Sequence, residues 1–297
     1  MSSEPGRALT LERAAAARVI LILGDTDTGK TTLTAALASG LAARGLPVGV
    51  IDADLGQSQI GPPAALGLGG VRAPIAALAE AELLALAWVG RTSPPGLEEA
   101  LWAGAARLVD RAAALGLRPV LVDTGGLVLG PLGRRLAVGT VRRLAPDLIV
   151  CLERDGECEP VLAEIAGRSS NGGPEVLRLP VAPAVRRRTS HERRGHRERA
   201  FEAYFAEARV RDLPLGCLEA DGRGDAVDRV RVPGALLGLL GPGGETLGLG
   251  RIVDVEPARD RIAVETPVRE PVARALVGGE RLAPPSRHQM TRHEVNA

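Results

Sequence analysis

Apolar and polar residues alternate along the first two thirds of the chain in blocks that predict strands and helices in turn. Short runs that are apolar throughout, such as VILIL at 19–23, are typical of strands buried on both faces of a parallel sheet. Longer segments with apolar residues at helical spacing follow them, and two of these end at a glycine, Gly45 and Gly116. The alternation predicts an α/β fold, a three-layer core in which helices cover both faces of a mostly parallel sheet.

The predicted strands carry polar side chains where they end. These strands are ARVILILGD, PVGVIDAD, LALAWVG, RPVLVDTGG, PDLIVCL and PEVLRLP. The carboxyl ends of parallel strands meet at one edge of the sheet, and such folds bind their ligands there. We therefore expect the polar residues at or just past the strand ends to lie close together. They are Asp25, Asp52, Asp54, Thr92 and Asp123.

Two later segments break this alternation. Residues 183–205 are rich in arginine, and after residue 208 the chain becomes short β-like runs separated by Gly, Pro and Asp turns. We expect the arginine-rich segment to belong to the α/β domain and the later runs to form a small C-terminal β domain. The predicted parts are a tail with a short helical turn at 1–17, an α/β domain at 18–208, a β-rich domain at 209–286 and a tail at 287–297.

Composition narrows the classes of protein that fit. Hydrophobic residues are 45% of the chain but aromatic residues only 2%, so the core must be aliphatic. The net charge of +1 gives no overall basic field, so a site for a polyanion must be a local cluster. No apolar run reaches the length of a membrane span, and the N-terminus lacks the apolar segment of a signal peptide. Cys151, Cys158 and Cys217 have the spacing of neither a metal site nor a redox motif, which favours a reducing cytoplasm.

The stretch GDTDTGKT at 24–31 has the pattern of a phosphate-binding loop and stands between a predicted strand and a predicted helix. In such a loop, backbone N–H groups and the start of the helix point at phosphate oxygens. The lysine reaches the β- and γ-phosphates, and the hydroxyl of Thr31 contacts Mg²⁺. We therefore expect a P-loop NTPase core that binds ATP and Mg²⁺. The expected nucleotide-binding residues are Gly24, Asp25, Thr26, Asp27, Thr28, Gly29, Lys30, Thr31 and Thr32.

Lys30 is the only lysine among the 37 Lys and Arg residues of the chain. A guanidinium is larger and planar, so it does not replace the compact ammonium of a phosphate-binding loop. The single lysine also argues against two classes of P-loop protein. Partitioning ATPases carry a second lysine early in the loop, and GTPases read guanine with an Asn-Lys-x-Asp motif.

Two carboxylates follow the second predicted strand, Asp52 and Asp54 in IDADLGQSQIGPP. With Thr31, they are expected to hold Mg²⁺ directly or through water, and one of them to accept a proton from an attacking hydroxyl. The spacing alone also allows both to be solvated turn residues.

Four short stretches, in order, resemble the polynucleotide 5′-hydroxyl kinases related to the kinase of the eukaryotic pre-mRNA cleavage machinery. They are the P-loop with Asp27 at its fourth position, the DxDxGQ stretch ending at Gln57, GRTSP at 90–94 and DTGGLVLG at 123–130. We call the last stretch the clasp. A looser match is the arginine-rich segment 183–205, which would form a lid and ends in Tyr204 and Phe205. The matches cover about residues 19–205, and their combination is more specific than any one of them.

The resemblance implies a role for each matching residue. Asp54 corresponds to the general base for the 5′-hydroxyl, and Lys30 acts on the phosphates. Arg193 and Arg197 are the expected catalytic lid arginines, with Arg194 as the alternative if the register is shifted by one residue. The residues expected to contact the substrate are Gln57, Thr92, Ser93, Thr124 and Gly126. Composition alone would equally allow the lid to be a solvated helix.

The clasp departs from the family pattern at one position. Leu127 replaces a tryptophan that is expected to pack against the nucleic acid, and leucine offers no aromatic face for stacking, worth roughly 1–3 kcal/mol per base. Trp88 and Tyr204 are the candidates to compensate, although Trp88 is expected in or near the core.

The expected activity is transfer of the γ-phosphate of ATP to the 5′-hydroxyl end of RNA or DNA, with a single strand favoured. The strand would be gripped mainly through its phosphates, which predicts weak sequence preference and marked salt sensitivity. Two alternatives stay open. One is a P-loop kinase for a small molecule, and the other is a non-catalytic ATP-binding scaffold of an RNA-processing assembly. Protein partners do not follow from the sequence.

Overall fold

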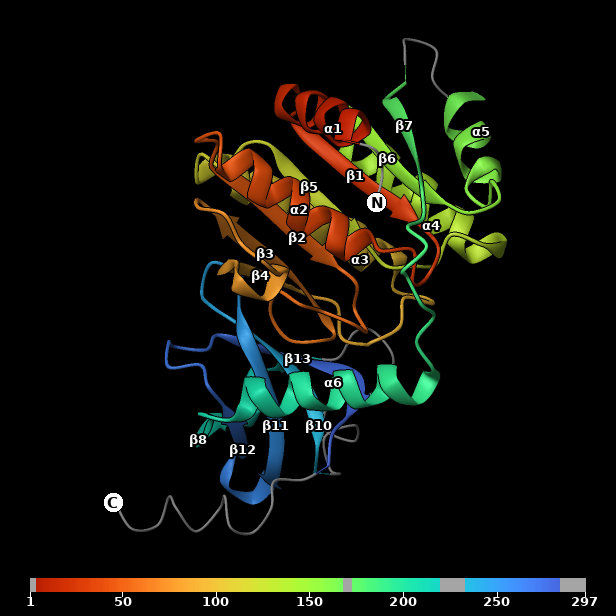
Figure 1. Cartoon of the computed structure of the whole chain (residues 1–297). Helices are drawn as coiled ribbons and strands as arrows, with labels where there is room; N and C mark the ends of the chain where they lie inside the picture. The colour runs from red at the N-terminus through yellow and green to blue at the C-terminus, as the bar shows by residue number, and fades with distance from the viewer. Residues whose placement is uncertain (1–3, 168–172, 220–232, 284–297) are drawn as a thin grey trace.

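The computed structural model describes residues 4–167, 173–219 and 233–283 (Figure 1). Its α-helices are α1 (Glu4–Ala16), α2 (Lys30–Ala42), α3 (Glu98–Ala114), α4 (Gly130–Leu144), α5 (Glu159–Gly167) and α6 (Ser190–Phe205). The strands of the α/β part are β1 (Val19–Gly24), β2 (Val48–Ala53), β3 (Ala65–Val71), β4 (Glu82–Trp88), β5 (Val120–Thr124), β6 (Leu148–Glu153) and β7 (Glu175–Pro180). The later strands are β8 (Arg209–Pro214), β9 (Leu218–Glu219), β10 (Ala235–Leu240), β11 (Thr246–Glu256), β12 (Arg261–Thr266) and β13 (Arg274–Arg281). In this described part, no helix is both long and apolar enough to cross a membrane.

The sheet of the α/β part runs in the order β7-β6-β1-β5-β2-β3-β4. The strands from β7 to β2 are parallel, whereas β3 is antiparallel to both of its neighbours. Helices α1 and α2 cover one face of the sheet, and α3, α4 and α5 cover the other. Each face has its own cluster of buried aliphatic side chains. The predicted three-layer α/β core with a mostly parallel sheet is therefore confirmed. The P-loop lies between β1 and α2, at the carboxyl end of a central strand.

Two elements differ from the sequence-based prediction. Residues 4–16, expected as a loose tail with a short helical turn, form helix α1, where Ala14 is fully buried. Strand β3 was missed because its sequence, ALGLGGV, is rich in glycine and poor in β-branched residues. Gly67 explains that composition, since a Cβ at this position would overlap the carbonyl of Ile60. A glycine is therefore required where the loop after β2 crosses the strand.

The C-terminal strands have an apolar core of their own and continue the same sheet. Strand β11 pairs with β4 through Thr246 and Leu86, and the cluster inside β10–β13 includes Leu237 and Ile252. Helix α6 lies along these strands (Figure 1) and packs Phe201 against them. The predicted tail at 287–297 lies outside the described residues.

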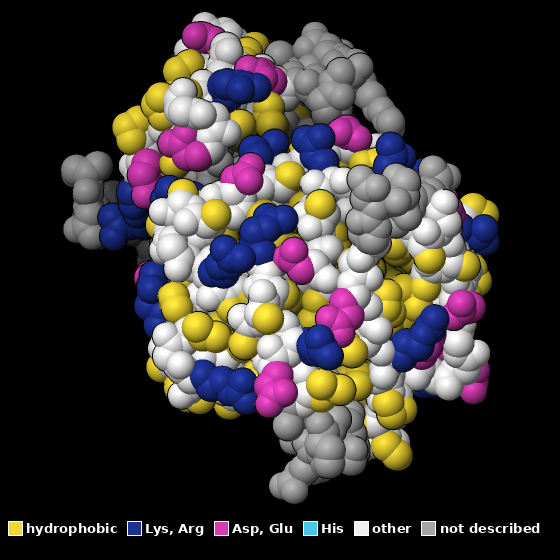
Figure 2. Space-filling view, turned by 90° about the horizontal axis from the view of Figure 1, so that it is seen from above, with side chains coloured by type: hydrophobic (Ala, Val, Ile, Leu, Met, Phe, Trp, Pro, Cys, Tyr) yellow, Lys and Arg dark blue, Asp and Glu magenta, His cyan; other side chains and the backbone are white. Residues whose placement is uncertain are grey.

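Charge is mixed over the face of the molecule that Figure 2 shows. Seen from above, basic and acidic side chains are interspersed among apolar ones (Figure 2), in keeping with a net charge of +1. A polyanion therefore needs a local cluster of cations, and the lid supplies one beside the P-loop.

Candidate active site

The P-loop holds its lysine folded back along the loop. The Nζ of Lys30 donates a hydrogen bond to the carbonyl of Asp25 at 2.8 Å, and the side chain is almost fully buried. Thr28 donates its hydroxyl to the same carbonyl at 2.9 Å. Burial lowers the pKa of Lys30, and the nearby carboxylates of Asp123 and Asp54 partly offset that effect. The ammonium is thus a desolvated cation, placed where a phosphate would compete for it.

A buried acid stands beside the loop threonine. The Oγ1 of Thr31 donates to Oδ2 of Asp123 at 2.7 Å, while Oδ1 of Asp123 is buried without a hydrogen-bond partner among the described residues. Asp123, the residue before the last of β5, is in register with Asp52 on β2. Burial and the charge of the neighbouring acids raise the pKa of both carboxyls. A divalent cation would relieve this clustering of negative charge, so the residues present fit a Mg²⁺ site at Thr31 and Asp123.

Asp52 holds the loop that follows β2. Its Oδ1 accepts the N–H of Asp54 at 3.0 Å, and its Oδ2 accepts those of Gln59 at 2.5 Å and Ile60 at 3.1 Å. Both oxygens are therefore engaged with backbone. The sequence singled out Asp52 and Asp54 as metal ligands and placed Asp123 at the same edge without that role. The signal for Asp123 was available, because an acid after a buried apolar strand beside the P-loop strand is positioned to meet the cation.

Asp54 faces the cavity in front of the P-loop. Its Oδ1 accepts the N–H groups of Gly56 and Gln57, each at 3.0 Å, and Oδ2 has no hydrogen-bond partner in the described chain. These two donors fix the orientation of the carboxylate. Its free oxygen is available to a hydroxyl entering the cavity.

The cavity has a volume of about 790 Å³ and is lined by the P-loop, the DxDxGQ loop, the clasp and the lid. Most of the predicted site residues line it. They are Thr26, Asp27, Thr28, Gly29, Lys30, Thr31, Thr32, Asp54, Gln57, Thr92, Thr124, Gly126, Arg193 and Arg197. Gly24, Asp25 and Asp52 lie behind this lining. Ser93 and Arg194 are exposed and do not line the cavity, so the structure does not bring them to the site.

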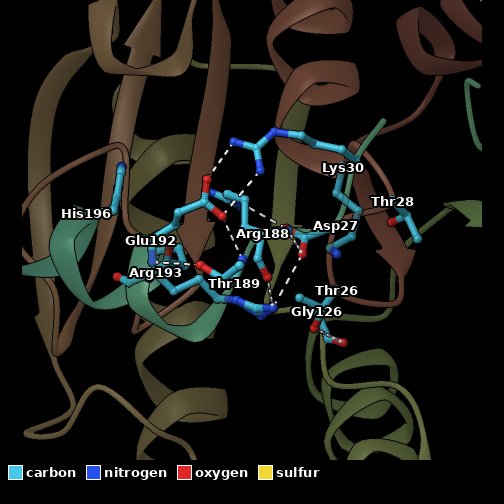
Figure 3. A network of polar contacts seen from close by, with 12 residues as sticks. Thr26, Asp27, Thr28, Lys30, Gly126, Arg188, Thr189, Glu192, Arg193 and His196 are labelled. Carbon is cyan, nitrogen blue, oxygen red and sulfur yellow. Dashed lines mark hydrogen bonds and ion pairs between the residues drawn. The ribbon is translucent and has the colours of Figure 1, made fainter. Parts of the chain in front are cut away.

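The lid is fastened to the P-loop by a cluster of charged groups (Figure 3). Arg188 donates its backbone N–H and its Nε to the two oxygens of Asp27, at 2.9 and 3.0 Å. Arg193 donates to the carbonyl of Arg188 at 2.6 Å and lies 3.5 Å from Asp27, while its Nε is buried without a hydrogen-bond partner in the described part of the chain. Helix α6 begins next to this cluster with a capping box between Thr189 and Glu192. Both arginines are therefore directed at a residue of the phosphate loop, although their side chains stay partly exposed.

Two glutamines connect the DxDxGQ loop to helix α6. The Nε2 of Gln57 donates to the carbonyl of Arg193 at 2.9 Å, and its Oε1 is buried without a partner among the described residues. The Nε2 of Gln59 lies 2.9 Å from Nε2 of His196. Burial, together with the charges of Arg188 and Arg199, lowers the pKa of His196. The histidine therefore adds no charge at neutral pH.

The clasp approaches the P-loop closely. Thr26 donates its hydroxyl to the carbonyl of Gly126 at 3.1 Å, and a Cβ at Gly126 would stand 2.5 Å from Cα of Thr26, which requires glycine there. Thr124 donates its hydroxyl to the carbonyl of Ile22 at 2.7 Å. Leu127 lines the cavity and is 40% exposed.

Neither aromatic candidate replaces the missing clasp tryptophan. Trp88 is buried between β4 and the C-terminal strands. The hydroxyl of Tyr204 accepts the N–H of Leu249 at 2.7 Å, which fixes that ring against β11. Both rings are used in packing, so Leu127 is left without aromatic support.

The C-terminal part contributes one contact to the site that the sequence did not reveal. Oε1 of Glu280, on β13, accepts both the N–H and the hydroxyl of Thr92, each at 2.8 Å. Thr92 in turn lines the cavity. Because the partners lie 188 residues apart, no local pattern could pair them.

The fold and the site together define a P-loop protein in which one cavity is lined by the phosphate loop, the DxDxGQ loop, the clasp and the arginine lid. The sequence matches the mRNA cleavage and polyadenylation factor CLP1 P-loop family over residues 24–207, and the chain belongs to this family. The resemblance inferred from the short motifs is thereby confirmed.

Named relatives are archaeal. The chain is 34% identical over 192 residues to a polyribonucleotide 5′-hydroxyl-kinase of Pyrococcus horikoshii, covering 64% of this chain and 50% of that protein. It is 32% identical over 212 residues to one of Pyrococcus furiosus, covering 70% and 56%. The matched part thus spans about half the length of these curated relatives. Among solved structures, Clp1p in complex with Pcf11p shares the fold with a TM-score of 0.70 at 14% identity, covering 92% of this chain and 77% of that one.

Proposed function

We propose that this protein is an ATP-dependent polynucleotide 5′-hydroxyl kinase that phosphorylates 5′-hydroxyl ends of RNA, DNA or both. One observation carries the proposal: Asp54, whose Oδ2 has no hydrogen-bond partner among the described residues, lines the same cavity as Lys30 and Thr31. The names of the archaeal relatives point to a polyribonucleotide as the acceptor. The free thiols Cys151, Cys158 and Cys217 fit the reducing cytoplasm, where we place this activity.

In this mechanism the P-loop binds the triphosphate, and the ammonium of Lys30 leaves the Asp25 carbonyl for the phosphate oxygens. Thr31 and Asp123 would hold Mg²⁺, which would supply positive charge beside the phosphates. Asp54 orients the 5′-hydroxyl and takes its proton as the new oxygen–phosphorus bond forms. The bond from the γ-phosphorus to the bridging oxygen breaks, and ADP leaves. Arg193 and Arg197 stabilise the charge of the transferring group from the lid side of the cavity.

Positioning supplies most of the catalysis in such a reaction, because the transferring group needs little covalent chemistry from the protein. The lid also limits water near the donor phosphate, which restrains hydrolysis of ATP without an acceptor. Gln57 supports both functions, since it ties the loop of Asp54 to the lid helix.

The test is a transfer assay with γ-labelled ATP, Mg²⁺ and matched 5′-hydroxyl RNA and DNA oligonucleotides. Label should appear on the 5′ end and be lost in Lys30→Ala and Asp54→Asn, and the ratio of RNA to DNA product defines the acceptor class. Nucleosides are tested in parallel. Label on a nucleoside alone would establish a small-molecule kinase. ATP binding without any labelled acceptor would leave the scaffold function and refute the kinase.

A further inference from the structure

Two thiols and a carboxylate meet at the end of β6. One ligand atom each of Cys151, Glu153 and Cys158 lies within 4.8 Å of the other two. Cys151 and Glu153 are two residues apart on a strand, so their side chains share a face. Cys158 stands directly before α5, and its carbonyl accepts the N–H groups of Val161 and Leu162 at 3.0 Å. A central strand and a helix start therefore hold the three groups together.

Glu153 distinguishes this cluster from ordinary buried cysteines, which often serve as small apolar side chains. Both thiols are fully buried, and the glutamate side chain is 14% exposed. Its Oε1 accepts a hydrogen bond from Arg178 at 2.9 Å, but Oε2 is buried without a hydrogen-bond partner among the described residues. A buried acceptor oxygen without a donor is unfavourable, and a cation between the three groups would satisfy it.

The donor set selects the kind of cation. Thiolates prefer soft or borderline metal ions such as Zn²⁺, whereas Mg²⁺ and Ca²⁺ take oxygen ligands. Bonds of about 2.3 Å to sulfur and about 2.1 Å to oxygen place tetrahedral ligands roughly 4 Å apart, so shifts of less than about 1 Å would close the site. The ion pair with Arg178 would orient the glutamate from behind, as outer partners of metal ligands do.

We propose that Cys151, Glu153 and Cys158 form a binding site for Zn²⁺ or a similar thiophilic divalent cation. On binding, each thiol loses a proton and forms a metal–sulfur bond, while the carboxylate supplies the third ligand. Two protons are released for each cation bound, and water can fill the fourth position. Because binding releases these protons, occupancy should fall as the solution becomes acidic.

The site is separate from the phosphoryl-transfer site but adjoins the P-loop. Strand β1 lies between β6 and β5, which carries Asp123. The carbonyl of Leu152 lies against Gly24, and Arg154 donates to the carbonyl of Asp27 at 2.6 Å. The thiophilic cation would therefore sit behind the phosphate loop.

The test titrates Co²⁺ into the reduced, metal-free full chain with excess Mg²⁺ and no nucleotide. We expect one equivalent to bind with a thiolate-to-cobalt charge-transfer band. Cys151→Ala and Cys158→Ala should abolish that band, and Glu153→Gln should weaken binding by at least about tenfold. Cys217→Ala is the matched control and should bind like the unaltered chain, because Cys217 lies in the C-terminal part.

A second measurement guards against misfolded variants. Zn²⁺ should raise the unfolding temperature of the unaltered chain and of Cys217→Ala. It should raise that of Glu153→Gln much less, and circular dichroism verifies that this variant is folded. A Co²⁺ spectrum without the thiolate band, or equal binding by Cys158→Ala, would overturn the proposal. The proposal would also be overturned, in favour of a redox pair, if Cys151 and Cys158 form a disulfide and the reduced protein binds no metal.

Discussion

Arg188 holds Asp27 with two donors, its backbone N–H at 2.9 Å and its Nε at 3.0 Å, across 161 residues of sequence. The Asp27 side chain is only 3% exposed. Burial alone would raise the pKa of Asp27, but the hydrogen bonds and charge of Arg188 hold it below its usual value. The acid at the fourth position of the P-loop therefore ties the lid to the loop.

Replacing this acid should loosen the lid. Asp27→Asn keeps the shape of the side chain, and asparagine also tolerates the left-handed backbone at this position, but the charge is removed. We expect the contact between lid and loop to weaken by about 1 kcal/mol, a small amount because Arg188 is 41% exposed. We expect several-fold faster amide exchange over residues 186–193 without nucleotide, and several-fold more ATP hydrolysis without an acceptor. Hydrogen exchange by mass spectrometry and a phosphate-release assay measure the two effects.

Arg187→Ala provides the control for that experiment. Arg187 lies in the same segment, is exposed and does not line the cavity. Its exchange and hydrolysis should stay close to those of the unaltered chain. Unchanged exchange in Asp27→Asn would mean that packing of α6, and not this ion pair, holds the lid.

The single lysine should not tolerate arginine. Lys30→Arg keeps the positive charge, but the buried space beside Asp25 and Asp123 is shaped for an ammonium. We expect a loss of about 100-fold or more in kcat/KM, as for removal of one electrostatic contact in a transition state. Steady-state kinetics measure it, and Arg44→Lys, on the exposed surface, is the control. Retention of more than about a tenth of the activity would refute the steric argument.

The local parts of this fold follow from the sequence. The apolar runs at 19–23 and 120–122 are buried strands because only a central parallel sheet covers both of their faces. The P-loop follows from glycine spacing and one lysine, since the backbone conformation and phosphate chemistry are both encoded within the stretch 24–31.

Other parts depend on contacts that no local pattern encodes. Strand β3 has a glycine at position 67 because the carbonyl of Ile60, in the preceding loop, folds back against it, and that glycine hides the strand. The role of Asp123 depends on its register with Asp52 and its contact with Thr31, both of which the sheet order decides. The contact of Glu280 with Thr92 likewise depends on the fold, because the two residues lie 188 positions apart in the sequence.

Glu280 should position the acceptor side of the cavity through Thr92. Glu280→Gln keeps one carbonyl acceptor but loses the charge that binds two donors at 2.8 Å. We expect the KM for the oligonucleotide to rise about three- to tenfold with little change in the KM for ATP, since a charged hydrogen bond is worth about 1.5–3 kcal/mol at most. Glu256→Gln, which loses ion pairs with Arg259 and Arg261 outside the cavity lining, is the matched control. Equal changes in both KM values would contradict a role on the acceptor side.

Restoring an aromatic ring at the clasp should strengthen substrate binding. Leu127 lines the cavity with 40% of its surface exposed, so Leu127→Trp can stack on a base without displacing the core. Stacking of roughly 1–3 kcal/mol per base predicts an affinity for single-stranded oligonucleotides about fivefold higher or more. Fluorescence anisotropy measures it. Leu129→Trp, exposed but outside the cavity lining, should change affinity little. An equal gain in both variants would indicate nonspecific stacking.

The buried acid next to Thr31 should cost the protein stability at high pH. Asp123 has its pKa raised by burial and by neighbouring acids, so it is easier to ionise in the unfolded chain than in the folded one. Stability is therefore greatest while the carboxyl is protonated, and it falls as the pH rises from the unfolded-chain value of about 3.9 through the folded-state pKa. Asp123→Asn removes this effect and keeps an acceptor for Thr31.

We expect Asp123→Asn to be more stable than the unaltered chain at pH 8, by on the order of 1–3 kcal/mol, and the difference to shrink towards pH 5. Urea unfolding at the two pH values measures it. Asp110→Asn, at an exposed position of α3, should show no such dependence. Mg²⁺ should stabilise the unaltered chain more than Asp123→Asn, because the variant lacks the charge that draws the cation. The opposite result would be a difference in stability, Asp123→Asn minus the unaltered chain, that is smaller at pH 8 than at pH 5. It would show that Lys30 compensates the buried charge in full.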